Sequence, residues 1–184
     1  MRRADAGVRS LEVGSALLVL ALMAVFVADI ALQVHAQGGR FVDGKLTIRD
    51  TQTNLMWEKK DSAGGLHDVS NAYTWCQATG NTEGLCAGAV SWIAQVNKEK
   101  FAGSSDWRIP TVKELSTIVD KASKGCGRGS PCINPIFGSS KAFRYWAGDD
   151  PRRTSRGSVD FSTGDTHQDH QLNQFHVRAV RTAQ

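Results

Sequence analysis

The clearest folding signal in this chain is the segment DWRIPTVKEL, which runs from Asp106 to Leu115. Within it, Glu114 follows Thr111 at the spacing of a capping box, in which two side chains bond the free backbone groups at a helix start. We therefore expect a helix that begins here and runs to about Asp120. Its apolar positions, which should be buried, are Val112, Leu115, Ile118 and Val119.

Residues 40–59, upstream of this segment, predict short strands joined by tight turns. Asp43-Gly44 lies between two apolar runs, and this dipeptide is a strong hairpin signal. Leu46 and Ile48 should share one face of their strand, because side chains alternate along a strand. Two helices should follow, at about 70–78 and 87–101. The second is indicated by apolar residues at helical spacing, which are Val90, Ile93, Ala94 and Val96.

The end of the chain has the pattern of strands again, at 143–147, 158–161 and 175–181. The last of these alternates regularly and is expected to be a central strand. Residues 121–140 are rich in Gly, Ser and Lys and should form a surface excursion. Strands at both ends with helices between them predict an α+β fold whose ends pair, with short antiparallel strands and two to three helices.

The first 36 residues have the order of a secretory signal peptide. A basic start is followed by an apolar run at 13–28 and then by the cleavage pattern Val34-His35-Ala36. The apolar run is shorter than the roughly 20 residues that cross a bilayer, which favours a cleaved signal over a retained anchor. We expect cleavage near Ala36, a single domain over residues 37–184, and a periplasmic or secreted product.

All four cysteines lie in the predicted mature part, and an even number of cysteines in an exported protein predicts two disulfides. The simplest pairing is local, Cys76 with Cys86 and Cys126 with Cys132, and four free thiols are the alternative. A zinc site is disfavoured, because the chain has no CxxC. The mature chain keeps the net charge of +4, since residues 1–36 hold equal numbers of basic and acidic groups.

Three motifs in order, Asn54–Lys59, Asp106–Leu115 and Val177–Arg181, resemble the Lcl C-terminal domain family. This family is the terminal module of a collagen-like bacterial adhesin and is described as a domain of unknown function. The resemblance runs from about Arg40 to Arg181. The family usually has Gly where this chain has Asn54, and Asn tolerates the same left-handed backbone conformation.

The segment from Arg108 to Thr111, with Glu114, is also similar to a motif of the formylglycine-generating, sulfatase-modifying enzymes. This resemblance implies a C-type-lectin-like fold. Those enzymes work through a pair of cysteines late in the domain, whereas this chain has none after Cys132. We therefore expect no oxidase activity.

The densest basic stretch of the mature chain is the candidate ligand site. Guanidinium groups pair bidentately with sulfate, phosphate or carboxylate, so these cations could hold an anionic polysaccharide. The family resemblance supports this, because the adhesin's domain is associated with sulfated glycans. The alternative is a solvated loop without a partner. The predicted ligand-binding residues are Lys141, Arg144, Arg152, Arg153 and Arg156.

Three further groups of residues receive structural or negative predictions. Trp57 and Trp107 should build the core, and Arg108 with Glu114 should form a partly buried pair at the helix start. A metal site is not expected, because the acidic and histidine residues near the end lack a calcium-loop pattern. These residues are Asp160, Asp165, His167, Asp169 and His170.

The functional prediction is an exported, non-catalytic binding module for an anionic or sulfated glycan or another extracellular polymer. The chain has no GxSxG, no HExxH and no phosphate-binding glycine loop, so we expect neither an enzyme nor a cofactor. Export and a modest charge argue against nucleic acid. Two alternatives stay open: a relative of the sulfatase-modifying enzymes, and a protein-interaction module of the cell envelope. Oligomerisation also stays open.

Overall fold

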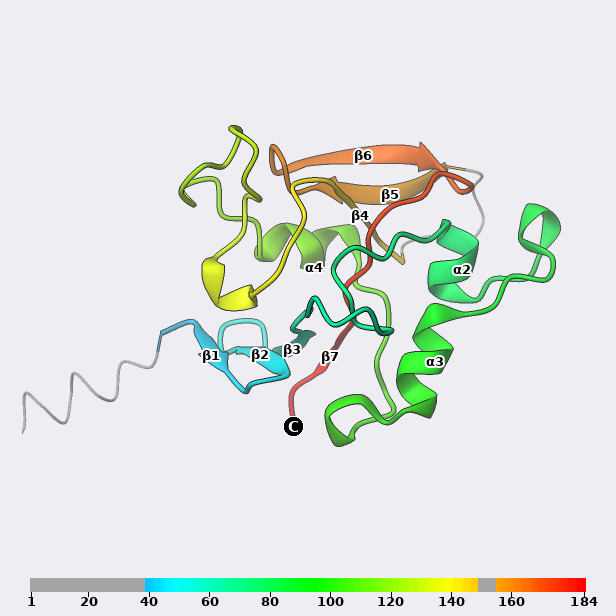
Figure 1. Ribbon diagram of the computed structural model, residues 1–184, viewed down its shortest axis with the longest axis horizontal. Helices are drawn as coiled ribbons and strands as arrows, with labels where there is room; N and C mark the ends of the chain where they lie inside the picture. Colours follow the sequence, from blue (N-terminus) through cyan, green and yellow to red (C-terminus); the bar gives the residue numbers. More distant parts are fainter. Residues whose placement is uncertain (1–38, 149–154) are drawn as a thin grey trace, which may run out of the picture. The chain divides into compact units, whose positions relative to one another are not determined.

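The computed structural model describes residues 39–148 and 155–184, and Arg40–Gln184 form one compact unit. Within these described ranges the fold is α+β, with two small antiparallel sheets and three α-helices, as predicted (Figure 1). The predicted signal peptide lies outside the described residues. No helix in the described ranges has the length and hydropathy needed to span a bilayer.

The first sheet joins the two ends of the domain. Its strands, in spatial order, are β1 (Phe41–Asp43), β2 (Thr47–Asp50), β3 (Leu55–Glu58) and β7 (Val180–Thr182). All neighbours are antiparallel, and Trp57 of β3 lies opposite Val180 of β7. The predicted pairing of the ends is therefore confirmed. The prediction that Leu46 and Ile48 share one face of a strand is wrong. Leu46 lies in the turn before β2 and is 55% exposed, whereas Ile48 is fully buried.

The second sheet is a meander of three strands. In order they are β4 (Arg144–Trp146), β5 (Ser155–Asp160) and β6 (Asp165–His170). The turn between β5 and β6 uses Gly164 with a positive φ of 80°, and its N–H donates to the carbonyl oxygen of Asp160. Sequence reasoning missed β6, because an edge strand with the sequence DTHQDH has no apolar alternation.

The helices are shorter than predicted. They are α2 (Trp75–Thr79), α3 (Trp92–Lys98) and α4 (Val112–Thr117), with 3₁₀ turns η1 (Gly84–Cys86), η2 (Phe101–Gly103) and η3 (Pro135–Phe137). The capping box of α4 is confirmed, since the Thr111 hydroxyl accepts the Glu114 N–H and the Glu114 carboxylate accepts the Thr111 N–H. Val90 precedes α3 and is exposed, so it is not part of that helix's apolar face.

The segment from Phe175 to Arg181 is not the predicted central strand. Its partners change along its length: Phe175 bonds Tyr73, the His176 backbone bonds residues of the β4 region, and Val180 bonds Arg108. Only β7 at its end is a regular strand, at the edge of the first sheet. The alternating pattern reflects burial against successive elements rather than membership of one sheet.

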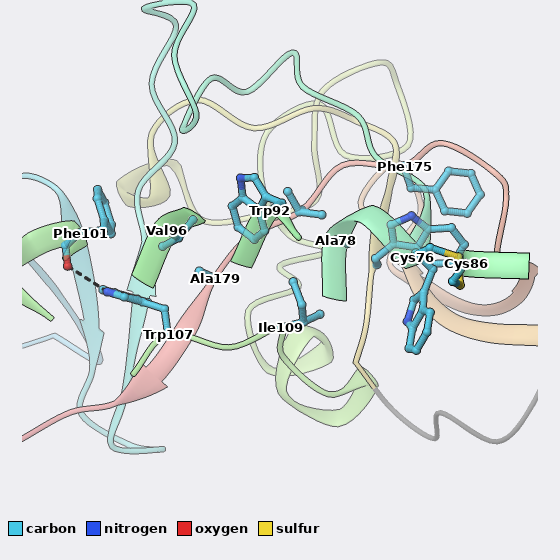
Figure 2. Packing of buried hydrophobic residues seen from close by; sticks show 13 residues of the cluster. Cys76, Ala78, Cys86, Trp92, Val96, Phe101, Trp107, Ile109, Phe175 and Ala179 are labelled. Carbon is cyan, nitrogen blue, oxygen red and sulfur yellow. Dashed lines mark hydrogen bonds between the residues drawn. A yellow bond between two sulfur atoms is a disulfide. The ribbon is translucent and has the colours of Figure 1, made fainter. Parts of the chain in front are cut away.

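The buried apolar residues form two clusters. The larger one, drawn in Figure 2, packs around four indole rings, those of Trp75, Trp92, Trp107 and Trp146. Each indole N–H donates to a backbone carbonyl, for example Trp107 to Phe101 at 2.9 Å. These bonds satisfy the polar end of each ring inside the core. The second cluster contains Trp57 and lies between α4 and the two sheets.

Two disulfides are present, as expected for an exported chain. They join Cys76 to Cys86 and Cys126 to Cys132, which is the local pairing. The first connects α2 to η1, and the second closes a glycine-rich loop after α4. Each disulfide lowers the conformational entropy of the unfolded chain. It also fixes a surface segment that has little regular structure of its own.

Candidate functional site

The predicted basic stretch does not form one cationic surface in the described residues. Lys141 is exposed, but Arg144 is half-buried and paired with the carboxylates of Asp169 and Asp160, the latter at 3.7 Å. The charge of Arg144 is thus neutralised within the domain. Arg152 and Arg153 lie outside the described residues.

Arg156 requires a correction. Its residue is only 5% exposed, its guanidinium carbon lies 4.0 Å from the centroid of the Trp75 ring, and its Nη2 donates to Gln171 at 3.2 Å. Alternation along β5 points this side chain toward α2 rather than toward solvent. Arg156 therefore contributes to the packing of the core and not to a surface that could hold a ligand.

A different set of cations is exposed on the segment that ends in the second disulfide, which joins Cys126 to Cys132. We call residues 121–132 the basic loop; it contains Lys121, Lys124 and Arg128 and no acidic residue. All three side chains are exposed. Lys121 pairs with the exposed Asp165 at 3.1 Å, whereas Lys124 and Arg128 have no ion pair with any acidic group in the described residues.

The basic loop is held by its own backbone and by the β5–β6 turn. The carbonyl oxygen of Gly125 accepts the N–H groups of Arg128 and Ser130 at 2.9 and 3.1 Å. Gly125 has a φ of 85°, and a Cβ there would lie 2.5 Å from the Ser130 hydroxyl. Gly127 and Cys132 donate their N–H groups to the turn at Ser162 and Phe161. The backbone that carries these cations therefore has a fixed conformation.

The sequence contained a signal for this loop. The prediction weighed the density of cations and selected residues 141–156, although Asp149 and Asp150 lie among them. The basic loop has fewer cations, but no acid lies between Lys121 and Cys132. Local charge balance, combined with a short disulfide span, was the more informative feature.

A buried polar network explains two of the three sequence motifs. The Glu58 carboxylate is fully buried and lies 2.6 Å from His67 Nδ1 and 2.9 Å from Lys60 Nζ, and it accepts the Ala179 N–H at 2.8 Å. Arg178 donates to the Glu58 carbonyl at 2.6 Å. The motifs containing Glu58 and Arg178 thus meet in one closed set of contacts.

The electrostatics of this network favour the charged form of Glu58. Burial pushes the pKa of Glu58 upward, but the Lys60 ammonium and the hydrogen bonds from His67 and Ala179 outweigh it and hold the pKa below its usual value. The network joins β3 to the segment before β7, because Glu58 lies in β3 and its partner Ala179 lies just before β7.

The predicted pair at the start of α4 is formed, and it is partly exposed to solvent. Arg108 donates from both terminal nitrogens to Glu114, at 2.7 and 2.5 Å, and the Arg108 side chain is 44% exposed. Hydrogen bonds from Arg108 hold the pKa of Glu114 below its usual value. Trp57 and Trp107 are buried. These four residues support the fold where the helix meets the sheet.

The acidic and histidine residues near the end of the chain serve the second sheet. Asp169 accepts from Arg144 and from the Ser158 hydroxyl at 2.6 Å, and Asp165 pairs with Lys121. Across the ranges that the structure describes, no group of three or more His, Cys, Asp or Glu side chains is arranged to hold a metal ion.

Comparison with known proteins agrees with the motifs. The family model for the Lcl C-terminal domain matches residues 46–181, from the turn before β2 to the middle of β7. No match is found among curated proteins. The family match spans well over half of the chain and includes all three motifs. The chain therefore belongs to the Lcl C-terminal domain family.

Proposed function

We propose that this protein is an exported, non-catalytic module that binds anionic polysaccharides, with sulfated glycans as the expected class. The observation that carries the proposal is the pair Lys124 and Arg128, both exposed without an acidic partner in the described residues. Arg128 lies inside the loop closed by Cys126 and Cys132, and Lys124 lies two residues before it. Membership of a family that includes an adhesin's terminal domain supports the same direction.

The chemistry of the two side chains suits a sulfated polymer. Arg128 presents a planar fork that can bond two sulfate or carboxylate oxygens, and Lys124 adds a compact positive charge. The loop is held by Gly125 and by the β5–β6 turn, so less backbone freedom is lost on binding.

Lys121 can contribute to polymer binding together with these two cations. Its ion pair with Asp165 is between side chains that are 62% and 58% exposed. Such a surface pair is screened by solvent and contributes little to stability, so an incoming sulfate can replace Asp165 at little cost. We expect Lys121 to strengthen binding less than Lys124 or Arg128.

The non-catalytic part of the proposal is supported by the roles of the buried ionisable groups. Glu58 contacts Lys60 and His67, and Asp169 contacts Arg144 and Ser158. These carboxylates, the most natural candidates for acid–base chemistry, are engaged in internal contacts.

The test is retention on an immobilised sulfated polysaccharide, heparin, during a sodium chloride gradient. The variant Lys124→Ala/Arg128→Ala should bind about tenfold more weakly, if each lost contact is worth about 0.7 kcal/mol. Lys98→Ala/Lys113→Ala is the matched control, because it removes the same charge from exposed positions on α3 and α4. Equal losses in the two variants would mean that only net charge matters and that the basic loop is not the site.

The variant Arg152→Ala/Arg153→Ala examines the competing position. If this variant loses binding and the basic-loop variant does not, the polysaccharide is held by the stretch selected from the sequence. No retention of the unaltered protein at low salt would exclude this ligand class altogether.

A second candidate function is protein recognition in the cell envelope. It is favoured by Leu85 and Val90, which are 63% and 69% exposed around the loop closed by Cys76 and Cys86. Exposed apolar side chains on a held loop suit an apolar partner surface. Binding that is insensitive to salt and lost in Leu85→Ser/Val90→Ser would support this function instead.

A further inference from the structure

The outer edge of β6 is the longest unpaired strand edge in the described residues. The second sheet ends at β6, which has six residues, and no described segment pairs with its outer side (Figure 1). Thr166, Gln168 and His170 are all exposed. Such an edge is a template for another strand, and proteins usually block it with lysine, proline, a bulge or an inward-pointing charge. Strand β6 has no lysine, proline or bulge, and its inward-pointing Asp169 is neutralised by Arg144 within the domain.

The hydrogen bonds of β5 show which backbone groups of β6 point outward. Ala147 N–H donates to the Gly157 carbonyl, so the odd-numbered residues of β5 face β4. The even-numbered residues of β5 therefore face β6, where they pair with Asp165, His167 and Asp169. It follows that Thr166, Gln168 and His170 direct their N–H and C=O groups away from the sheet.

We propose that β6 is a self-association edge, which pairs antiparallel with β6 of a second copy of this chain. The outward residues must pair with outward residues, and a two-fold axis at Gln168 satisfies this condition. In this register Gln168 lies opposite itself, and Thr166 lies opposite His170 of the second copy. The two three-stranded sheets become one continuous sheet.

The charges of β6 select this register over its neighbours. With the axis at Gln168, His167 lies directly opposite Asp169 of the second copy, twice by symmetry. A shift of two residues in one direction places Asp165 opposite Asp169, and a shift in the other places Asp169 opposite itself. Like charges directly opposite one another destabilise a strand pair, and the register with the axis at Gln168 places no two carboxylates opposite one another.

A single pair of short strands buries little surface, so the dimer should be weak and depend on concentration. Even a weak dimer should raise the affinity for a polymer, because it presents two basic loops on one scaffold. Once the first loop has bound, binding of the second is intramolecular. The dimer itself does not depend on the polysaccharide, and its test is separate.

The first test is sedimentation equilibrium of the purified protein over a range of concentrations. The average mass should rise from one chain toward two. Gln168→Pro should remain monomeric, because proline removes an outward N–H while the ladder to β5 stays intact. Gln168→Ala is the matched control and should dimerise as before. Circular dichroism and the melting temperature of both variants check that the fold is retained. A monomer at every concentration, or equal association of the two variants, overturns the proposal.

The second test is cross-linking that reads the register. Gln168→Cys should form a disulfide-linked dimer under mild oxidation, because the two thiols lie opposite each other. Thr166→Cys is also exposed on the same strand but should not cross-link, since the two copies of this position are on the order of 13 Å apart along the strands. Equal cross-linking of the two variants would mean random collision and would exclude this register.

Discussion

Two groups of cationic side chains in this domain differ in what they contact: one group pairs inside the fold, and the other faces solvent. Arg144 and Arg156 lie on strands, where alternation directs their side chains toward carboxylates and an indole ring inside the fold. Lys124 and Arg128 lie on a glycine-rich loop, where few internal groups compete for them. Cation density along the chain therefore says little about anion binding, because the backbone conformation decides whether a charge is used internally or faces solvent.

The largest effect in this comparison is expected at Arg156. Arg156→Ala should lower the free energy of unfolding by about 3 kcal/mol, because it empties a buried site and leaves Trp75 and Gln171 without this partner. Urea unfolding measures the change. The control is Arg128→Ala, which should cost less than about 0.5 kcal/mol. Equal losses would contradict the distinction between buried and solvent-facing arginines.

Asp169→Asn should have the next largest effect. The substitution removes the charge that pairs with Arg144 and weakens the bond from the Ser158 hydroxyl, at an expected cost of about 2 kcal/mol. Asp165→Asn, on the same strand, is the control and should lower the free energy of unfolding much less, since its pair with Lys121 is exposed. Thermal or urea unfolding of both variants distinguishes them, and a larger loss for Asp165 would refute this ranking.

Arg108 is an intermediate case, because its ion pair with Glu114 is well formed but only partly buried. Arg108→Ala should cost about 1 kcal/mol at neutral pH, less than Arg156→Ala. The Arg108 hydrogen bonds lower the pKa of Glu114, so the pair stabilises the fold fully above the unfolded pKa of about 4.3. That contribution is lost as the pH falls through the lower folded pKa.

Unfolding of the parent and of Arg108→Ala, followed from pH 7 to about pH 3, checks this dependence. The difference in unfolding free energy should shrink at the acidic end. A constant difference would mean that Arg108 acts through the packing of its aliphatic stem instead of through its charge.

The smallest effect on stability should come from the basic loop itself. Lys124→Ala/Arg128→Ala should change the free energy of unfolding by less than about 0.5 kcal/mol, because neither side chain has a partner in the described residues. The same variant should show the largest loss of heparin retention. A clear loss of stability together with a loss of retention would point to a damaged loop rather than a removed contact.

Several local features were predictable from the sequence. Thr111 and Glu114 form the predicted capping box, and Asn54 adopts the left-handed conformation with a φ of 54°. The disulfides join the nearest cysteines. Each of these features depends on side chains a few residues apart, so the sequence spacing is also the spatial relation.

The features that were missed depend on partners that the pattern of a single segment does not reveal. Strand β6 has no apolar period of its own and forms because β5 supplies its partners. The segment after Phe175 alternates like one strand but bonds three different neighbours in turn. A pattern of buried positions records that a residue is covered, and several arrangements of neighbours can cover it equally well.

Local chemistry thus specified the helix start, the turns, the disulfides and the family motifs, because these depend on short-range bonds between residues close in the chain. Packing settled the roles of the charged groups. Glu58 is buried because Lys60, His67 and Ala179 surround it, and Arg156 is buried because β5 turns it toward Trp75. The basic loop stays exposed because backbone hydrogen bonds at Gly125 and Gly127 and the disulfide at its end hold it in place without drawing Lys124 and Arg128 inward.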